Sequence, residues 1–299
     1  MKLATYSDGS SGPRAGIVTS DSRLIDIGSA SQGNLPDSLL EVLQRPDWLE
    51  ELSDLVGTAE AGPSLDEVTL HTPIARPGKI LAAAGNYQAH VDEGGGVKVD
   101  TSRRTPRVFI KPSSALVGPD EPVVLTDVSD EIDWELELAV VIGKEASNVS
   151  RDDALSYVAG YTILNDISAR SMSWGIEDRE VHDWDGFFDW LVGKWPDSFS
   201  PTGPWIVTAD EIEDPHSLQL TLEVNGEVTQ SASTGTMIFD CSDLISFISR
   251  FTTLEPGDII ATGTPAGVGA ATGRYLEAGD VMVGTIEGIG TLTTPVVDA

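Results

Sequence analysis

In the stretch Ile132-Asp-Trp-Glu-Leu-Glu-Leu-Ala-Val-Val-Ile142, β-branched and aliphatic residues are combined with acids at every second position, a pattern that predicts a strand. Side chains of a strand point alternately to its two faces, so Glu135 and Glu137 point to the same face. A second apolar segment, Gly160-Tyr-Thr-Ile-Leu-Asn-Asp166, predicts another strand that ends on an acid. The two segments together predict a sheet that carries three carboxylates.

Glu135, Glu137 and Asp166 form a candidate metal site. Neighbouring carboxylates repel each other unless a cation or solvent lies between them, and a set of oxygen donors suits Mg²⁺ or Mn²⁺. Such a site leaves coordination positions open for substrate or water, as catalysis requires. The alternative is that the alternating acids form the solvated face of a strand, since acids are common in this chain.

The charge of the chain excludes several kinds of partner. It has 48 acidic and 18 basic residues, a net charge of −30, and only six of the bases are lysine. Such a field repels nucleic acid and anionic membranes, so we expect neither as a partner. An acidic, lysine-poor surface fits a cytoplasm with molar salt, where screening removes most self-repulsion. We therefore expect a halophilic host.

Length and composition place the chain among globular proteins. Its 299 residues suffice for one large domain or two unequal ones. No apolar run is long enough to cross a bilayer and the N-terminus lacks the apolar core of a signal peptide, so we expect a cytoplasmic protein. The single cysteine, Cys241, excludes an internal disulfide, and we expect it to be a small buried residue and not a nucleophile.

The chain divides into two expected units. Residues 1–73 contain short strand patterns followed by helical apolar spacing over 36–56, and residues 72–79, with two prolines and a glycine, resemble a linker. The second unit, 77–299, is dominated by strand patterns, with helices expected over 151–156, 169–176 and 242–251. The fold class is therefore α+β and mostly β, a mixed β domain around a ligand cavity with a small N-terminal α/β unit.

The segment Gly85-Asn-Tyr-Gln-Ala-His-Val-Asp-Glu93 carries a candidate general base. If it is helical from Tyr87, His90 and Glu93 share a face and can form a hydrogen bond. A carboxylate partner raises the basicity of an imidazole and fixes its tautomer, which suits activation of water. A lone histidine is more often structural. The three glycines that follow Glu93 suggest a mobile lid, with an ordinary surface loop as the alternative.

Two other segments carry candidate substrate-binding groups. Lys194 lies among aromatic and apolar residues, which fits either a buried, paired ammonium that contacts an oxyanion or a lysine that merely covers aromatic rings. A strand over 258–261 runs into a glycine-rich loop, where backbone N–H groups and the Thr264 hydroxyl could bind a carboxylate or phosphate. That loop lacks the lysine of a nucleotide-binding P-loop.

Taken in order, the segments of residues 77–297 resemble the fumarylacetoacetate hydrolase family. The matching pieces are Gly85-Asn-Tyr-x-x-His-x-x-Glu93, Lys111-Pro-Ser-Ser-Ala-Leu, Asp133-Trp-Glu-Leu-Glu-Leu, Asn165-Asp-Ile-Ser-Ala-Arg170, Gly193-Lys, Pro201-Thr-Gly-Pro204, Val224-Asn-Gly-Glu-Val-x-Gln and the run from Phe251 to Gly269. Each piece is weak alone, but their shared order is specific. The family pattern usually has a glutamine shortly after Arg170, and this chain lacks it.

The resemblance implies a mixed β-roll, a homodimer, and an enzyme that uses Mg²⁺ or Mn²⁺ on a 2-oxo acid through a metal-stabilised enolate. It implies the following roles: metal ligands Glu135, Glu137 and Asp166; a water-activating pair, His90 and Glu93; groups on substrate oxygens, Lys194 and Arg170; and a turn for a substrate carboxylate, Gly263 and Thr264.

The resemblance does not name the reaction. Expected activities are C–C bond hydrolysis, isomerisation or decarboxylation of acylpyruvates or of substrates like 2-hydroxyhepta-2,4-diene-1,7-dioate. One alternative is dehydration of a 2-keto-3-deoxy sugar acid, and another is a family member that binds a metabolite without turning it over. The acidic and aromatic segment 174–193 is longer than is common in the family, so we expect it to shape the mouth of the pocket.

Overall fold

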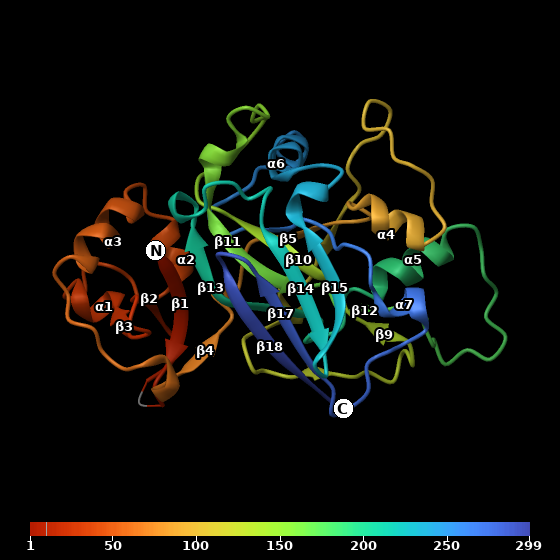
Figure 1. Ribbon diagram of the computed structural model, residues 1–299, viewed down its shortest axis with the longest axis horizontal. Helices are drawn as coiled ribbons and strands as arrows, with labels where there is room; N and C mark the ends of the chain where they lie inside the picture. Colours follow the sequence, from red (N-terminus) through yellow and green to blue (C-terminus); the bar gives the residue numbers. More distant parts are fainter. Residues whose placement is uncertain (10) are drawn as a thin grey trace.

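The computed structural model describes residues 1–9 and 11–299, and Figure 1 shows its course. Its helices are α1 (Ile27–Ala30), α2 (Leu39–Leu43), α3 (Trp48–Val56), α4 (Gln88–Glu93), α5 (Asp185–Val192), α6 (Cys241–Ser249) and α7 (Gly269–Thr272). Its strands are β1 (Lys2–Ser7), β2 (Arg14–Val18), β3 (Leu24–Asp26), β4 (Thr69–His71), β5 (Ile80–Ala83), β6 (Val108–Lys111), β7 (Leu116–Val117), β8 (Val123–Val124), β9 (Ile132–Asp133), β10 (Leu136–Ile142), β11 (Val158–Asn165), β12 (Ser168–Ala169), β13 (Ser200–Thr208), β14 (Gln219–Val224), β15 (Glu227–Ser233), β16 (Ile259–Ala261), β17 (Val281–Ile286) and β18 (Gly290–Val297).

Two sheets form the body of the molecule. The larger has the order β3-β2-β1-β13-β11-β10-β16-β5-β6, with β4 beside β1 and β7 beside β13, and the smaller has the order β15-β14-β17-β18-β8. The main core contains residues of both sheets, among them Leu138, Leu222 and Leu292. The prediction of a mixed, mostly β fold is confirmed.

Strand β10 shows how alternation places the acids. Leu136 and Leu138 point into the core shared by the two sheets, as period-two alternation requires. Glu137 and Ala139 therefore point to the other face, where Ala139 joins a second core cluster. Both faces of this strand are buried, so the acids do not form a solvated face.

The N-terminal strands extend the large sheet. Strand β1 pairs antiparallel with β13, with Leu3 opposite Ile206. The apolar cluster of the N-terminal segment also includes Val141, Ala159 and Ile206 from the longer part of the chain. The units that we expect at 1–73 and 77–299 thus share one sheet and one packed boundary.

The helix predictions were partly wrong. Helices α2, α3 and α6 lie where apolar spacing predicts them, but the helix predicted over 169–176 does not form. Ala169 belongs to strand β12, and the N–H groups of Ala169 and Arg170 donate to the carbonyls of Gly193 and Glu131. Backbone bonds to distant segments replace the helical ones there. The predicted helix over 151–156 is reduced to a short 3₁₀ turn at Ala154–Tyr157.

The strand predicted over 132–142 is interrupted between β9 and β10. At the interruption the Glu135 N–H donates to Asn165 Oδ1 at 2.9 Å, and its carbonyl accepts from the Asp166 N–H at 2.8 Å. These bonds tie the end of β11 to the start of β10. They bring the two acid-bearing segments together.

Helices α4, α5 and α7 gather at the end of the molecule opposite the N-terminal helices (Figure 1). A long connection follows α4 and another precedes α5 at this end (Figure 1). In the described parts of the chain we find no helix of the length and apolarity that crossing a bilayer demands.

Candidate active site

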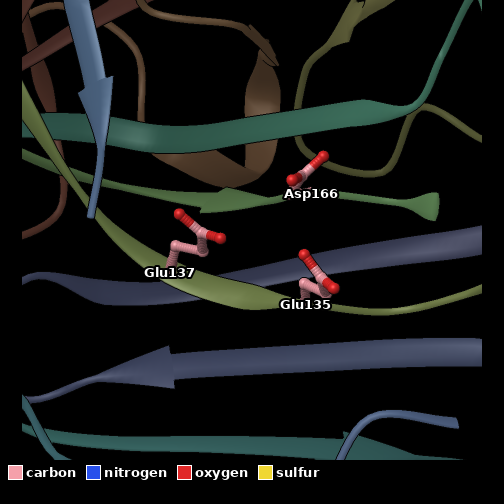
Figure 2. A group of neighbouring side chains, drawn as sticks. All are labelled: Glu135, Glu137 and Asp166. Atoms are coloured by element: carbon pink, nitrogen blue, oxygen red, sulfur yellow. The ribbon is translucent and has the colours of Figure 1, made fainter. Parts of the chain in front are cut away.

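Glu135, Glu137 and Asp166 converge on one point (Figure 2). Glu135 and Glu137 extend from the same strand segment, and Asp166 faces them from the end of the neighbouring strand. One carboxylate oxygen from each lies within 4.8 Å of the others. The predicted cluster is confirmed as an arrangement of side chains.

All three carboxylates are buried, and the negative charge of Glu137 has the fewest partners that offset it. Its side chain accepts a hydrogen bond from the Gly263 N–H at 2.6 Å, and no cationic group among the described residues forms an ion pair with it. Burial raises the pKa of Glu137 well above its usual range, and the charges of Asp166 and Glu135 raise it further. A buried carboxylate without a cation is costly, so this position favours a bound cation.

Three basic side chains offset the other acids. The Lys194 ammonium donates to Glu135 at 2.7 Å and to Asp166 at 2.9 Å. Lys111 donates to the second oxygen of Asp166 and to the carbonyl of Phe199. Arg170 bridges Asp133 and Glu135, with distances of 2.7 and 2.5 Å. Each cation therefore has an acidic partner in the cluster.

The electrostatics of Glu135 and Lys194 reflect this pairing. Burial by itself would raise the pKa of Glu135, but the charges of Lys194 and Arg170 outweigh burial and lower it. Burial would lower the pKa of Lys194, but the charges of Asp166 and Glu135 outweigh it and raise the pKa. Glu135 and Lys194 therefore form a buried ion pair of two charged groups.

The cluster fits a divalent cation by its donor set. Four acids, including Asp133, lie close to three basic side chains, and Glu137 is the acid that has no cationic partner in the described part of the chain. Carboxylate oxygens are the donors that Mg²⁺ and Mn²⁺ prefer. Glu135, Glu137 and Asp166 would hold such an ion.

His90 and Glu93 form the predicted pair on helix α4. His90 Nδ1 lies 2.7 Å from Glu93 Oε1, and the other carboxylate oxygen accepts from the Gly267 N–H at 2.9 Å. Glu93 is thus fixed by the glycine-rich loop and in turn orients the imidazole. Since Nδ1 is held by Glu93, Nε2 of His90 is the nitrogen available for chemistry.

A cavity of about 180 Å³ lies next to the cluster. It is lined by residues of β5, α4, β6 and α5 and of the segments that flank β5, β6, β9, β12, α5 and β16. These residues are Ala83, Ala84, Gly85, His90, Arg107, Phe109, Glu135, Arg170, Trp190, Lys194 and Thr264. Five predicted site residues thus share one small cavity: His90, Glu135, Arg170, Lys194 and Thr264. Trp190 confirms that the segment 174–193 contributes to the cavity wall.

Lys194 is 2% exposed, and its ammonium lies 5.5 Å from the ring centre of Phe109 and 5.7 Å from that of Trp190. Of the two readings, the buried and paired ammonium is the one observed. Two of its three N–H donors hold carboxylates, which leaves one for a ligand in the cavity.

Gly263 and Thr264, which we expect to bind a substrate carboxylate, both have hydrogen-bond partners within the protein. The Gly263 N–H is engaged by Glu137, and its φ of +91° with Asn86 2.6 Å from any added Cβ requires glycine there. The Thr264 hydroxyl donates to the Leu136 carbonyl at 3.0 Å. Of the two residues, Thr264 lines the cavity, and contact of either with a substrate remains a prediction.

Three polar residues that no local pattern singles out are bonded to the residues of the site. Lys111 is 1% exposed and pairs with Asp166, Asp133 pairs with Arg170, and Gln230 connects strand β10 to Thr264. Each lies in a segment that matches the family pattern, which is the signal that could have found them. Their partners are distant in sequence.

Comparison with known proteins supports this arrangement. A family model described as fumarylacetoacetate (FAA) hydrolase C-terminal matches residues 79–297. The mitochondrial oxaloacetate tautomerase FAHD2A of Bos taurus is 38% identical over 290 residues, which cover 96% of this chain and 88% of the relative. The 2,4-didehydro-3-deoxy-L-rhamnonate hydrolase of Sphingomonas sp. (strain SKA58) is 39% identical over 281 residues, with coverages of 93% and 90%.

A solved structure is similar over its whole length. It is maleylpyruvate hydrolase from Sphingobium sp. SYK-6 in complex with manganese(II) ion and pyruvate, with a TM-score of 0.79, 32% identity and full coverage of both chains. The similarity therefore extends through the N-terminal segment, and that protein binds a divalent ion.

Proposed function

The chain belongs to the fumarylacetoacetate hydrolase family, and on that premise we propose that it moves a proton on a small 2-oxo acid with the help of a divalent cation. The observation that carries this proposal is that two side chains line the same cavity of about 180 Å³. These are Glu135 of the carboxylate cluster and His90 of the histidine–glutamate pair. Cation site and proton carrier thus face the same small space.

The cation would be held by Glu135, Glu137 and Asp166. When bound, it supplies a positive charge that polarises a 2-oxo group and offsets negative charge that develops on the oxygen. Lys194 directs its remaining N–H donor at the same oxygen. Phe109 and Trp190 exclude water on one side of the cavity, which strengthens both interactions.

His90 is the proton carrier in this proposal. Its Nε2 takes a proton from the carbon next to the 2-oxo group and returns a proton to oxygen, or acts in the opposite direction. Glu93 stabilises the imidazolium that forms between the two transfers. The result is keto–enol tautomerisation, which needs no second substrate and so suits a small cavity.

C–C bond hydrolysis is the second candidate, because an imidazole that is oriented by a carboxylate can also activate water. The His90–Glu93 contact is the observation that favours it. Decarboxylation and sugar-acid dehydration would use the same polarised 2-oxo group. These activities are separable only by substrate.

The test is turnover with and without the cation. Purified protein loaded with Mn²⁺ or Mg²⁺ is assayed with enol oxaloacetate, acylpyruvates and 2-keto-3-deoxy-pentonates, by the loss or gain of enol absorbance and by product analysis. We expect tautomerisation of a short 2-oxo acid, its loss in EDTA and its return when Mn²⁺ is restored. Turnover that persists after verified metal removal would refute the proposal. Binding without turnover would support the non-catalytic alternative.

We also propose, from the charge alone, that the protein works in molar salt. At about 1 M salt the screening length falls to about 3 Å, so repulsion among exposed acids fades. Each kcal/mol of relieved repulsion raises the Tm by about 2–4 °C in a protein of this size. We expect a Tm several degrees higher in molar KCl than in dilute buffer. A variant with neutral amides at the exposed Glu60, Asp152 and Glu180 should gain less, and equal Tm values for the wild type in both buffers would contradict the idea.

A further inference from the structure

Arg107 differs from the other cationic groups that line the cavity. His90 contacts Glu93, Arg170 contacts Asp133, and Lys194 contacts Glu135. The Arg107 guanidinium has no hydrogen bond or ion pair with any residue in the described ranges 1–9 and 11–299, although acids outnumber bases by 48 to 18 in this chain. A cation left without an acid in so acidic a protein is available to a ligand.

The position of Arg107 next to strand β6 directs its side chain to the side of the cavity. Its carbonyl accepts from the Ala84 N–H at 2.9 Å, and β6 then pairs with β5. Side chains two residues apart share a face of a strand. Arg107 therefore points to the same side as Phe109, which forms the cavity wall, and as Lys111, which reaches Asp166.

Arg107, Phe109 and Lys111 follow one another along one strand face, and their exposure falls from Arg107 to Lys111. Lys111 is 1% exposed and Phe109 is 8% exposed, whereas Arg107 is exposed. Four residues of strand span about 13 Å. Lys111 thus marks the buried end with the carboxylate cluster, and Arg107 marks the open end. A ligand bound at the cluster would extend toward Arg107.

We propose that Arg107 binds a second carboxylate of the substrate, so that the enzyme selects dicarboxylic over monocarboxylic 2-oxo acids. The inference rests on the proposed function for the 2-oxo end of the molecule. At the other end, a guanidinium offers paired N–H donors that match a carboxylate. The small cavity limits the spacer between the two ends to a short chain.

The test compares two ligands that differ only at the distal end, oxaloacetate and its 4-methyl ester. Their Kd values are measured by calorimetry on Mg²⁺-loaded wild type, Arg107→Gln and Arg107→Lys, and kcat/KM is measured separately. Because Arg107 is exposed, we expect Arg107→Gln to weaken oxaloacetate binding by about three- to fivefold. Binding of the ester should change less than twofold by comparison, and Arg107→Lys should restore part of the loss.

Arg104→Gln is the matched control. Arg104 is an exposed cation on the same loop that does not line the cavity, so its replacement removes the same charge without removing the contact. We expect it to leave both Kd values unchanged. An equal effect of Arg104→Gln would mean general attraction of anions and would overturn the inference.

Other outcomes separate this inference from the proposed function. Arg107→Gln could weaken the binding of both ligands equally, or the wild type could bind the ester as tightly as the diacid. Either result would mean that Arg107 does not bind a second carboxylate, whatever the turnover. If wild type discriminates between the ligands through Arg107 but converts neither, the inference stands and the proposed function fails. If neither ligand binds, both are overturned.

Discussion

Replacing Glu137 with alanine should abolish divalent-metal binding and turnover together. Glu137 is the buried member of the cluster without a cationic partner among the described residues, so the bound ion is its main compensation. Loss of groups that merely support a metal ligand typically costs 10- to 100-fold in affinity, so loss of a ligand should cost about 100-fold or more. Calorimetric titration with Mn²⁺ and the 2-oxo acid assay measure the two effects.

The shape-conserving Glu137→Gln keeps an acceptor for the Gly263 N–H while it removes the charge. We expect it to weaken metal binding as well, and to raise the Tm of the metal-free protein because an unpaired buried charge is gone. Glu145→Ala removes an exposed acid shortly after β10 and should change neither property. Full metal affinity in Glu137→Gln would exclude Glu137 as a ligand.

Replacing His90 with asparagine should lower kcat by about 10²- to 10⁴-fold while metal binding is retained, because a positioned general base contributes about that much. His90 lines the cavity but is not among the converging carboxylates. Glu93→Gln should give a smaller loss, since the imidazole remains but loses the partner that orients it. Steady-state kinetics at saturating Mn²⁺, together with Mn²⁺ titration, separate the two effects.

His182→Asn is the control for the histidine variant. His182 lies in the exposed stretch before α5 and outside the cavity lining, so its loss should leave kcat unchanged. If His90→Asn were fully active, proton transfer by His90 would be wrong. If the variant lost the metal, its effect on rate would not identify a base.

The arrangement of charge explains why these variants should differ. Glu135 and Asp166 are each held by lysine or arginine partners, whereas Glu137 has no cationic partner among the described residues. Breaking a buried pair leaves an uncompensated charge, at a cost of about 3–5 kcal/mol. We therefore assign Lys111 a structural role in keeping Asp166 in place.

Much of the fold could be predicted from local pattern. The alternation in β10 and the apolar run of β11 predict the central strands, and the spacing in α6 predicts a helix. The pattern failed where backbone groups bond to distant segments. Ala169 lies in a stretch with helical spacing but pairs with β9. Strand β15 has few apolar residues, and its pairing with β14 cannot be read from its own composition.

By itself, the sequence determined which groups are candidates for the chemistry. The shared face of Glu135 and Glu137 and the spacing of His90 and Glu93 follow from the periods of strand and helix, which are local properties of the backbone, and Asp166 ends a second apolar run. The order of the family segments is equally a property of the chain. The structure brings the three acids together and places the histidine beside its glutamate, and Glu135 and His90 line the cavity.

Only the tertiary structure decided which charges meet. Three features depend on the register of strands far apart in the sequence. Lys194 is paired with acids, Lys111 reaches Asp166, and Arg107 lines the cavity with no acidic partner within residues 1–9 and 11–299. The strength of an electrostatic interaction depends on distance and burial. Neither quantity exists until the sheets pack, so the chain's composition alone could not supply them.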